Sequence, residues 1–356
     1  MNNTGSIALL SARLHEGGVA DHVASLAKAL EKLGTVVLTL ERVSDFVRET
    51  QSQCNRQGIS WIGIHFVAYG WARHGILSNR DIAEIREACA DRRVALYFHE
   101  LWLGESQNTT LQNRLLGFIQ RRRLLHLIRA LAPDKVLTSN STYQAMLARY
   151  HVAANVLPLF GNLPAATDKD RADARAWLAS NAIDDQTSLI AVFGTIHPEW
   201  DAAPALRDWL ARANRAQSSV TLITLGQHGP VGSVRLRQLQ QDLPQLRIIS
   251  TGTKPAPFLA GLLRECTFGL ATTPWALIGK SGTAAAMREA GLPVLVTRDD
   301  WHWRYGQTPF PTDDPQLVLW SNDRRFDWDT FLAGRNAPSQ NLPQAAEAWQ
   351  QIARSS

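Results

Sequence analysis

The sequence predicts an α/β protein built from two Rossmann-like domains that face each other across a cleft. Short apolar runs of strand type alternate with amphipathic helical runs along most of the 356 residues, which is typical of parallel sheets covered by helices. The alternation restarts after a stretch of turn-forming residues at 161–170, and the length fits two domains of roughly 150 residues each. We therefore expect an N-terminal domain in 1–165, a C-terminal domain in 166–338, and a terminal helix in 339–356 that could cross back to the N-terminal domain.

The individual elements follow from hydrophobic periodicity. Val23, Leu26, Ala27 and Leu30 recur at the spacing of one helix face, for example, so 20–33 is expected to be a helix. In the first half the pattern predicts strands at 6–10, 36–40, 61–67, 94–98 and 135–138, and helices at 20–33, 81–90, 111–131 and 142–150. In the second half it predicts strands at 189–193, 220–225, 246–250, 268–271 and 294–297, and helices at 203–213, 257–264, 284–290 and 343–354.

Composition excludes several classes of protein. The net charge of +5 is only mildly basic, and aromatic residues do not interleave with the basic clusters, so nucleic acid is not an expected partner. Cys54, Cys89 and Cys266 lie far apart without metal-binding spacing, and they are expected to be buried, reduced thiols. No apolar run is long enough to span a membrane, and the N-terminus lacks the order of a signal peptide. We expect a cytoplasmic protein with no metal site and no cofactor.

The densest basic cluster is Arg121-Arg122-Arg123, inside the long helix expected at 111–131. Such a run is usually a solvated helix face. It can also be attracted to an acidic membrane surface, where each basic residue contributes about 1 kcal/mol. Both interpretations stay open, and the second would place the protein at the periphery of the inner membrane.

Residues 279–283 carry the strongest functional signal. A small-residue loop containing Lys280, Ser281, Gly282 and Thr283 follows a strand and opens directly into a helix. Free N–H groups and the helix dipole favour an anion at such a place, and a lysine adds charge, so a diphosphate is the expected ligand. A P-loop is disfavoured because Pro274 stands where its first glycine would be. A tight βαβ turn that binds nothing is the remaining alternative.

Five segments occur in the order of a known family. They are Gly17-Gly18-Val19-Ala20-Asp21-His22-Val23, Thr138-Ser139-Asn140-Ser141, the stretch 157–164 (LPLFGNLP), the stretch 193–199 (FGTIHPE), and the stretch from Pro274 to Pro293. Together they resemble the glycine loop, the "TNS" segment, the domain-joining stretch, the "GRL.PEKG" loop and the donor-site motif of family-4 glycosyltransferases of the GT-B fold. The resemblance covers nearly the whole chain.

The resemblance implies transfer of a sugar from a nucleotide-diphosphate sugar to an unidentified acceptor, without a metal and with retention of anomeric configuration. The chain departs from the family at two places. The glutamates of the family's E-x7-E motif fall on Ile278 and Ala286, and the basic pair of the "GRL.PEKG" loop falls on Thr195 and Trp200. The alternatives are a non-catalytic nucleotide- or sugar-binding protein on this scaffold, and a sugar-nucleotide epimerase of GT-B shape.

Candidate site residues follow from the loop chemistry and from the resemblance. His99 and Glu100, directly after the strand at 94–98, are the candidate catalytic residues, with Glu100 as a base if the enzyme inverts. Gly17 and Gly18 join Lys280, Ser281, Gly282 and Thr283 as expected diphosphate-binding residues. The donor vicinity is expected to contain Thr195, His197, Glu199, Gly226, Gln227, Pro274 and Arg298, and the acceptor vicinity His22, Trp102 and Asn140.

Overall fold

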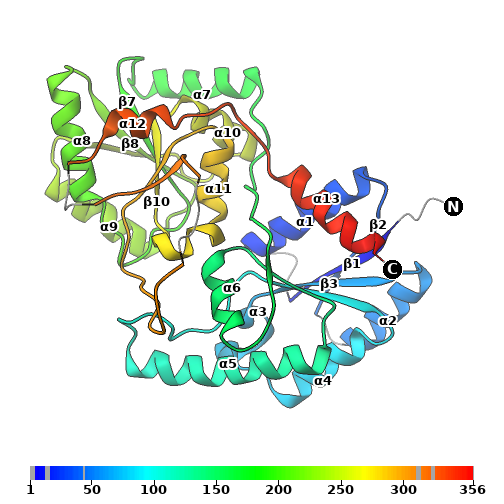
Figure 1. Ribbon diagram of the computed structural model, residues 1–356. Coiled ribbons are helices and arrows are strands. Elements are labelled where there is room, and N and C mark those ends of the chain that lie inside the picture. The colour runs from blue at the N-terminus through cyan, green and yellow to red at the C-terminus, as the bar shows by residue number, and fades with distance from the viewer. Residues whose placement is uncertain (1–4, 13–16, 43–44, 310–313, 322–324, 356) are drawn as a thin grey trace. The chain divides into compact units, whose positions relative to one another are not determined.

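The chain divides into two compact units, each built on a parallel β-sheet (Figure 1). The computed structural model describes residues 5–12, 17–42, 45–309, 314–321 and 325–355. Unit 1 comprises 1–160, 302–309 and 341–356, and unit 2 comprises 161–301 and 310–340. The predicted α/β class with two Rossmann-like sheets is confirmed.

The described part of unit 1 contains a six-stranded sheet in the order β2-β1-β3-β4-β5-β6. All neighbouring strands are parallel. The order places β1 between β2 and β3, so the crossovers β1–β2 and β2–β3 run in opposite directions along the sheet. The strands are β1 (Ser6–Ser11), β2 (Val36–Glu41), β3 (Trp61–Phe66), β4 (Arg93–Phe98), β5 (Lys135–Thr138) and β6 (Asn155–Val156).

Helices cover the unit 1 sheet. Helix α1 and the C-terminal helix α13 pack together over one face, where Leu26 and Trp349 join the core with Ile7 and Leu9 of β1. Helix α4 packs against both α2 and α5. The helices are α1 (Gly18–Lys32), α2 (Phe46–Arg56), α3 (Ala68–Trp71), α4 (Asn79–Ala88), α5 (Leu111–Leu131), α6 (Ser141–Ala148) and α13 (Leu342–Arg354), with a 3-10 turn η1 (Arg73–Gly75).

Unit 2, where described, also holds a six-stranded parallel sheet, in the order β12-β11-β10-β7-β8-β9. Counted from β7 as the first strand, this is the 3-2-1-4-5-6 order of a doubly wound dinucleotide-binding sheet. The strands are β7 (Ser188–Phe193), β8 (Val220–Leu225), β9 (Arg247–Ser250), β10 (Phe268–Ala271), β11 (Val294–Val296) and β12 (Leu317–Leu319).

Alternate residues of β7 explain why helices lie on both faces of this sheet. Ile190 and Val192 pack with α8 and α9 in one core, whereas Leu189, Ala191 and Phe193 pack with α7, α10 and α11 in the other. Apolar side chains on both sides of a strand must be covered on both sides. The helices are α7 (Asp168–Ser180), α8 (Ala203–Arg215), α9 (Gly229–Asp242), α10 (Ala256–Glu265), α11 (Gly282–Glu289) and α12 (Trp328–Ala333), with a 3-10 segment η2 (Trp275–Lys280).

Several expected boundaries need correction. The stretch 161–170 is not all linker, because Thr167 and Asp170 form a capping box that begins α7 at Asp168. Helices α2, α3, α7, α9 and α12 and strands β6 and β12 were not expected. Helix α9 has polar residues at half of its positions and begins with Gly229-Pro230, so its periodicity is weak.

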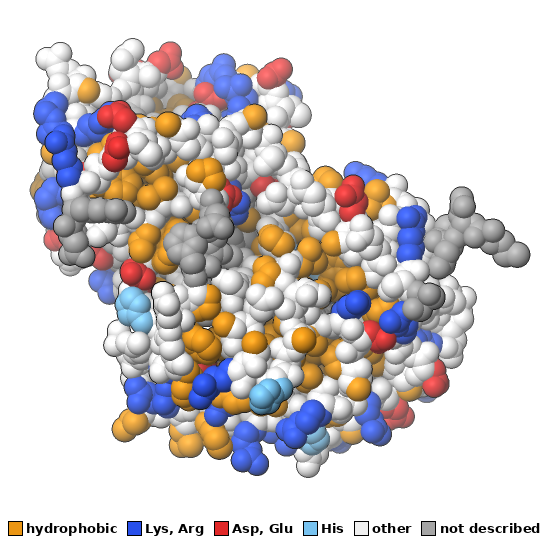
Figure 2. Space-filling model, viewed as in Figure 1, with side chains coloured by type: hydrophobic (Ala, Val, Ile, Leu, Met, Phe, Trp, Pro, Cys, Tyr) orange, Lys and Arg blue, Asp and Glu red, His pale blue; other side chains and the backbone are white. Residues whose placement is uncertain are grey.

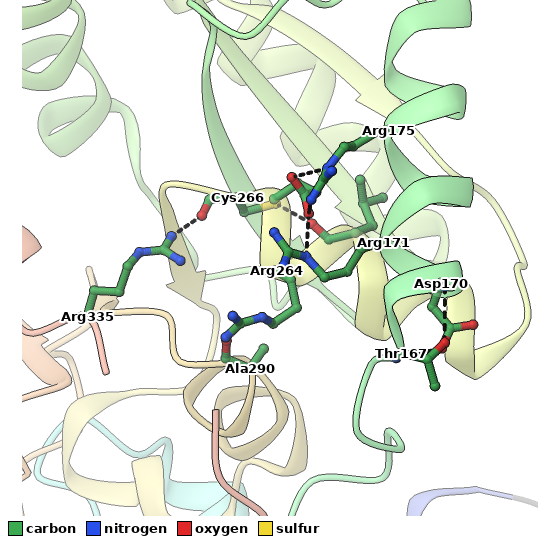
Figure 3. A network of polar contacts seen from close by, with 10 residues as sticks. Thr167, Asp170, Arg171, Arg175, Arg264, Cys266, Ala290 and Arg335 are labelled. Carbon is green, nitrogen blue, oxygen red and sulfur yellow. Dashed lines mark hydrogen bonds and ion pairs between the residues drawn. The ribbon is translucent and has the colours of Figure 1, made fainter. Parts of the chain in front are cut away.

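A polar network ties α7 to α10 (Figure 3). Arg171 and Arg175 both donate to the carboxylate of Glu265, with Nε–O distances of 2.8 and 3.1 Å. Arg335 donates to the carbonyl oxygen of Cys266. The three cysteines are free and buried, as expected, and burial raises the pKa of the Cys266 thiol to about 12. These contacts hold the helices that cover the sheet on the side of α11.

Close backbone packing between α7 and α10 yields a stability prediction. A Cβ at Gly261 would lie 2.3 Å from the carbonyl oxygen of Asp170, so Gly261→Ala must push the two helices apart. We expect unit 2 to lose about 1–3 kcal/mol of unfolding free energy, the usual cost of overpacking, measured by urea denaturation. Gly282→Ala is the control, because no heavy atom lies within 4 Å of its added Cβ. Equal stability of the two variants would show that α7 and α10 are less tightly packed than described.

Candidate functional site

The topology of unit 2 selects one edge of its sheet for ligand binding. In this strand order the connections after β7 and β10 leave the sheet in opposite directions, and open α/β sheets bind ligands outside the carboxyl ends of the strands at such a switch point. The segments that follow these strands are 194–202 and 272–281. They contain most of the donor-site residues expected from the sequence.

Helix α11 begins at this edge. Its N-cap is Ser281, whose Oγ accepts a hydrogen bond of 3.2 Å from the backbone N–H of Ala284. The Ser281 hydroxyl is therefore part of the helix cap, and it also lies 3.2 Å from Oγ1 of Thr283. Gly282 has open space where a Cβ would be, so a ligand atom can approach its backbone closely. The first-turn N–H groups of Gly282 and Thr283 have no acceptor within the helix, which is the property that lets a helix N-terminus accept an anion.

The segment after β7 lies against the start of α11. Gly194 has φ +79°, and a Cβ there would come within 2.9 Å of Cγ2 of Thr283. The hydroxyl of Thr272, at the end of β10, donates to the carbonyl oxygen of Thr195 over 2.8 Å. These contacts place Gly194 against Thr283 and Thr195 against Thr272.

Arg298, which follows β11, is buried and fully engaged in the unit. Its guanidinium donates from Nε and Nη2 to the carboxylate of Asp300 at 2.9 and 2.6 Å, and from Nη1 to the carbonyl oxygen of Thr272 at 3.1 Å. Glu199 forms a further ion pair with it at 3.6 Å. Two carboxylates thus offset its positive charge, and Arg298 positions the ends of β10 and β11.

The pKa of His197 reflects the burial and the charges at the carboxyl edge of the unit 2 sheet. Partial desolvation of its ring and then the positive charges of Arg298 and Lys280 lower the His197 pKa, while Glu199 and Asp300 act in the opposite direction. A neutral imidazole is therefore favoured at pH 7. Lys280 is half-buried at the end of η2 and is near enough to His197 to affect its titration.

The other expected donor residues sit around this edge. Pro274 is buried and precedes η2 as its N-cap. Gly226 has φ +72° and directly follows β8, and its N–H donates to the Thr251 hydroxyl at 3.3 Å. Gln227 donates to Oγ1 of Thr253 over 3.2 Å. Gly226 and Gln227 therefore contact the segment after β9, on the other side of β7 from α11.

The two positions that lack the family's glutamates are filled by core packing. Ile278 and Ala286 are 2% and 3% exposed and belong to the apolar core on the α11 side of the sheet. Gly161 packs directly on Ala286, since a Cβ at Gly161 would lie 2.6 Å from the Ala286 Cα. The Gly161 N–H donates to Oε1 of Glu289 at 2.9 Å. Neither position 278 nor position 286 offers a polar group to a ligand.

In unit 1, three histidines form a buried cluster at the carboxyl edge of the sheet. His22 comes from the start of α1, His65 from β3, and His99 from the residue after β4. Nδ1 of His65 and Nε2 of His99 are 3.0 Å apart, so one donates to the other. The ring of His22 stacks on Phe160 with centroids 4.1 Å apart. The sequence pointed to His99 and His22, but His65 was missed because it lies inside an apolar strand.

Burial keeps these three rings neutral. Desolvation lowers the pKa of His22 to about 3, and it lowers those of His65 and His99 well below the ordinary value, with like-charge repulsion inside the cluster adding to the effect. Their ring nitrogens lie within 4.8 Å of one another, so among the described residues this cluster is where imidazoles could reach one metal ion. Nε2 of His65 is buried in the cluster without a hydrogen-bond partner.

The remaining unit 1 candidates divide into open and structural positions. Gly17 and Gly18 are exposed at the start of α1, and the φ of +91° at Gly17 suits glycine. Glu100 is half-buried beside His99. Asn140, by contrast, is the buried N-cap of α6, accepting from the N–H of Tyr143 at 2.9 Å.

Glu105 is a structural centre that the sequence did not reveal. This buried carboxylate accepts from the indole N–H of Trp102 at 2.6 Å, from Arg121 at 3.2 Å and from the indole N–H of Trp303 at 3.3 Å. Trp102, expected near the acceptor, is therefore held in place by Glu105. The contact from Trp303 docks the segment 302–309 onto unit 1.

Sequence comparison alone places the chain in no group, since no family model and no curated protein matches it. Several solved structures resemble it. A glycosyltransferase from Rickettsia africae ESF-5 has a TM-score of 0.53 at 12% identity, covering 99% of this chain and 93% of that chain. Anabaena HepE in complex with UDP and glucose has 0.49 at 15%, covering 82% and 80%. The UDP-GlcNAc 2-epimerase from Methanocaldococcus jannaschii has 0.47 at 11%, covering 98% of both chains. The likeness to the first structure shows a shared fold, and membership of family 4 stays a prediction.

The histidine cluster predicts acid sensitivity of unit 1. Because the His22 pKa is lowered to about 3 in the folded state, only the unfolded chain takes up its proton below the ordinary value of 6.5. Its contribution to stability is therefore complete above pH 6.5 and falls as the pH drops toward 3. From pH 7 to pH 5 the loss for this one group is about 2 kcal/mol.

Urea unfolding at the two pH values measures this effect. His22→Phe, which keeps an aromatic ring against Phe160, should remove about 2 kcal/mol of the pH dependence. The matched control is His126→Gln, at an exposed position on α5. The same pH dependence in His22→Phe as in the native protein would mean that His22 is not buried as a neutral ring.

Proposed function

We propose that the protein is a glycosyltransferase that binds a nucleotide-diphosphate sugar at the carboxyl edge of the unit 2 sheet and transfers the sugar to an acceptor hydroxyl. The observation that carries the proposal is the meeting of the 194–199 segment, Lys280 and the N-terminus of α11 beside the β7–β10 switch point. The fold shared with a solved glycosyltransferase supports it.

The diphosphate is the leaving group, so the site must stabilise negative charge that grows on it. The N–H groups of Gly282 and Thr283 and the dipole of α11 provide fixed positive ends there, and Lys280 adds a full charge. Lys280 is the cation we assign to the diphosphate, because it ends η2 directly before Ser281, the N-cap of α11. With this charge supplied by the chain, the proposed reaction is metal-independent.

In unit 1 we assign the acceptor side of the reaction to the carboxyl edge of β4. Glu100 is the half-buried carboxylate there, and His99 beside it is held neutral within the histidine cluster. A neutral His99 can orient a hydroxyl but is not an acid at neutral pH. Following the family, we propose retention of configuration, with Glu100 as the base if the reaction inverts.

One observation favours a second candidate, a nucleotide-binding protein without transfer activity. Ile278 and Ala286 are buried in the core at the positions of the family's two glutamates, the second of which would hydrogen-bond the donor ribose. A site that retains its diphosphate element but lacks these groups could bind a nucleotide without catalysis. The two candidates share diphosphate binding and differ only in turnover.

Lys280→Ala tests the diphosphate assignment. Loss of one charge-assisted contact should weaken nucleoside diphosphate binding by about 1.5–3 kcal/mol, which is roughly tenfold to a hundredfold in Kd, measured by calorimetric titration. Lys169→Ala is the control, because this lysine is exposed on α7 of the same unit and pairs with Asp173 at 2.6 Å. An unchanged Kd in folded Lys280→Ala would remove Lys280 from the site.

Turnover separates the two candidate functions. Release of free nucleoside diphosphate from a bound nucleotide sugar, with or without an added acceptor, would support the transferase. Tight nucleotide binding with no release under any acceptor condition would favour the non-catalytic protein.

A further inference from the structure

One face of α5 exposes apolar side chains to solvent. Leu111 and Leu115 are 81% and 65% exposed, and Phe118 and Ile119 are 44% and 37% exposed. Their spacing of four, seven and eight residues from Leu111 places them on one side of the helix. Arg122, His126 and Arg129 continue the same exposed side toward the C-terminus. We call these seven residues the α5 outer face.

The opposite side of α5 is firmly docked. Leu124 and Leu127 are fully buried, and a Cβ at Gly117 would lie 1.9 Å from the carbonyl oxygen of Leu103. Gln120 is buried and accepts from the N–H of Leu103 at 2.9 Å while donating to the carbonyl of His74 at 2.8 Å. Because the helix cannot rotate, its outer face stays turned to solvent.

The charge of this helix is entirely positive. The α5 sequence contains five arginines and no acidic residue. Arg121 and Arg123 are engaged within unit 1, by Glu105 at 3.2 Å and by the Leu77 carbonyl and the Asn79 side chain respectively. The arginines at 121–123 therefore do not form one exposed basic patch, because two of them are bound within unit 1. Arg122 is exposed, with its guanidinium 5.7 Å from the ring centre of Phe118.

Figure 2 shows hydrophobic and basic side chains side by side along the edge of the molecule over α5. Apolar and basic groups on one exposed helix face suit the interface of an anionic bilayer, where the apolar groups enter the acyl boundary and the arginines meet lipid phosphates. Among the described helices, none is long and apolar enough to cross a membrane. An apolar protein groove would not use Arg122 and Arg129, and a second copy would bring like charges together.

We propose that the α5 outer face is a membrane-docking surface that binds anionic phospholipid bilayers peripherally, with Leu111, Leu115, Phe118 and Ile119 inserted and Arg122 and Arg129 at the headgroups. This surface is independent of the proposed nucleotide site. It extends the contact considered for the arginine run by adding the apolar residues that anchor it.

Co-sedimentation with vesicles tests the surface. The full chain should bind vesicles of phosphatidylcholine with phosphatidylglycerol, bind phosphatidylcholine alone far more weakly, and lose affinity as salt rises. The double variant Leu111→Ser and Leu115→Ser should bind at least about tenfold more weakly, because two largely exposed leucines no longer enter the bilayer. Arg122→Gln should reduce binding to the anionic vesicles only.

Val234→Ser is the matched control, since Val234 is an exposed apolar residue on α9 of unit 2, 55% exposed. It should bind vesicles as the native chain does. No binding of the native chain to anionic vesicles at low salt would overturn the proposal. Native-like binding by the double leucine variant would also overturn it. So would the finding that the native chain is a dimer, that the double variant is a monomer, and that lipid changes neither state.

A fluorescent reporter locates the contact. The native cysteines are buried, so a polarity-sensitive dye attached to Leu115→Cys labels the outer face selectively. Anionic vesicles should shift its emission to the blue, while the same dye on Val234→Cys should not respond. A response at Val234→Cys with none at Leu115→Cys would place the lipid contact elsewhere. No nucleotide is present, so failure here leaves the proposed function unaffected.

Discussion

The order of the strands beside β7 governs the chemistry available to unit 2. Parallel strands must be joined by crossover helices, and where consecutive crossovers leave a sheet in opposite directions the loops part at the carboxyl edge. In unit 2 this point lies between β7 and β10. The same edge receives the N-terminus of α11. The diphosphate assignment depends on this coincidence more than on any one side chain.

The contacts of Arg298 distinguish its role from that of Lys280. Arg298 has the stronger intrinsic fit to phosphate, because a guanidinium can bind two oxygens at once. It is nevertheless buried and bound by Asp300 in two hydrogen bonds, which makes it a brace between β10 and β11. Lys280 lies at the end of η2, directly before the N-cap of α11. We assign Lys280 and the helix N-terminus to the ligand.

Much of the fold could be predicted from the sequence because buried parallel strands are short apolar runs, and α5 was predicted with its observed bounds, Leu111–Leu131. Helix α9 and strand β12 could not, since a polar helix and a three-residue strand have almost no periodicity. The contacts of individual side chains were harder to predict than the helices and strands. Asn140 and Trp102 were expected near the acceptor from their place after strands, but their partners, the Tyr143 N–H and Glu105, are visible only in three dimensions. His65 and the α5 outer face were missed for the same reason, because exposure and side-chain convergence are not sequence properties.

Calorimetric titration of the native chain with UDP, GDP, ADP, TDP and CDP tests the central claim most directly. The account predicts saturable binding of at least one nucleoside diphosphate, much weaker binding of the corresponding nucleoside, and a thermal shift that rises with ligand concentration. Equal affinity for a nucleoside and its diphosphate, or no binding of any diphosphate, would contradict a diphosphate site at the start of α11.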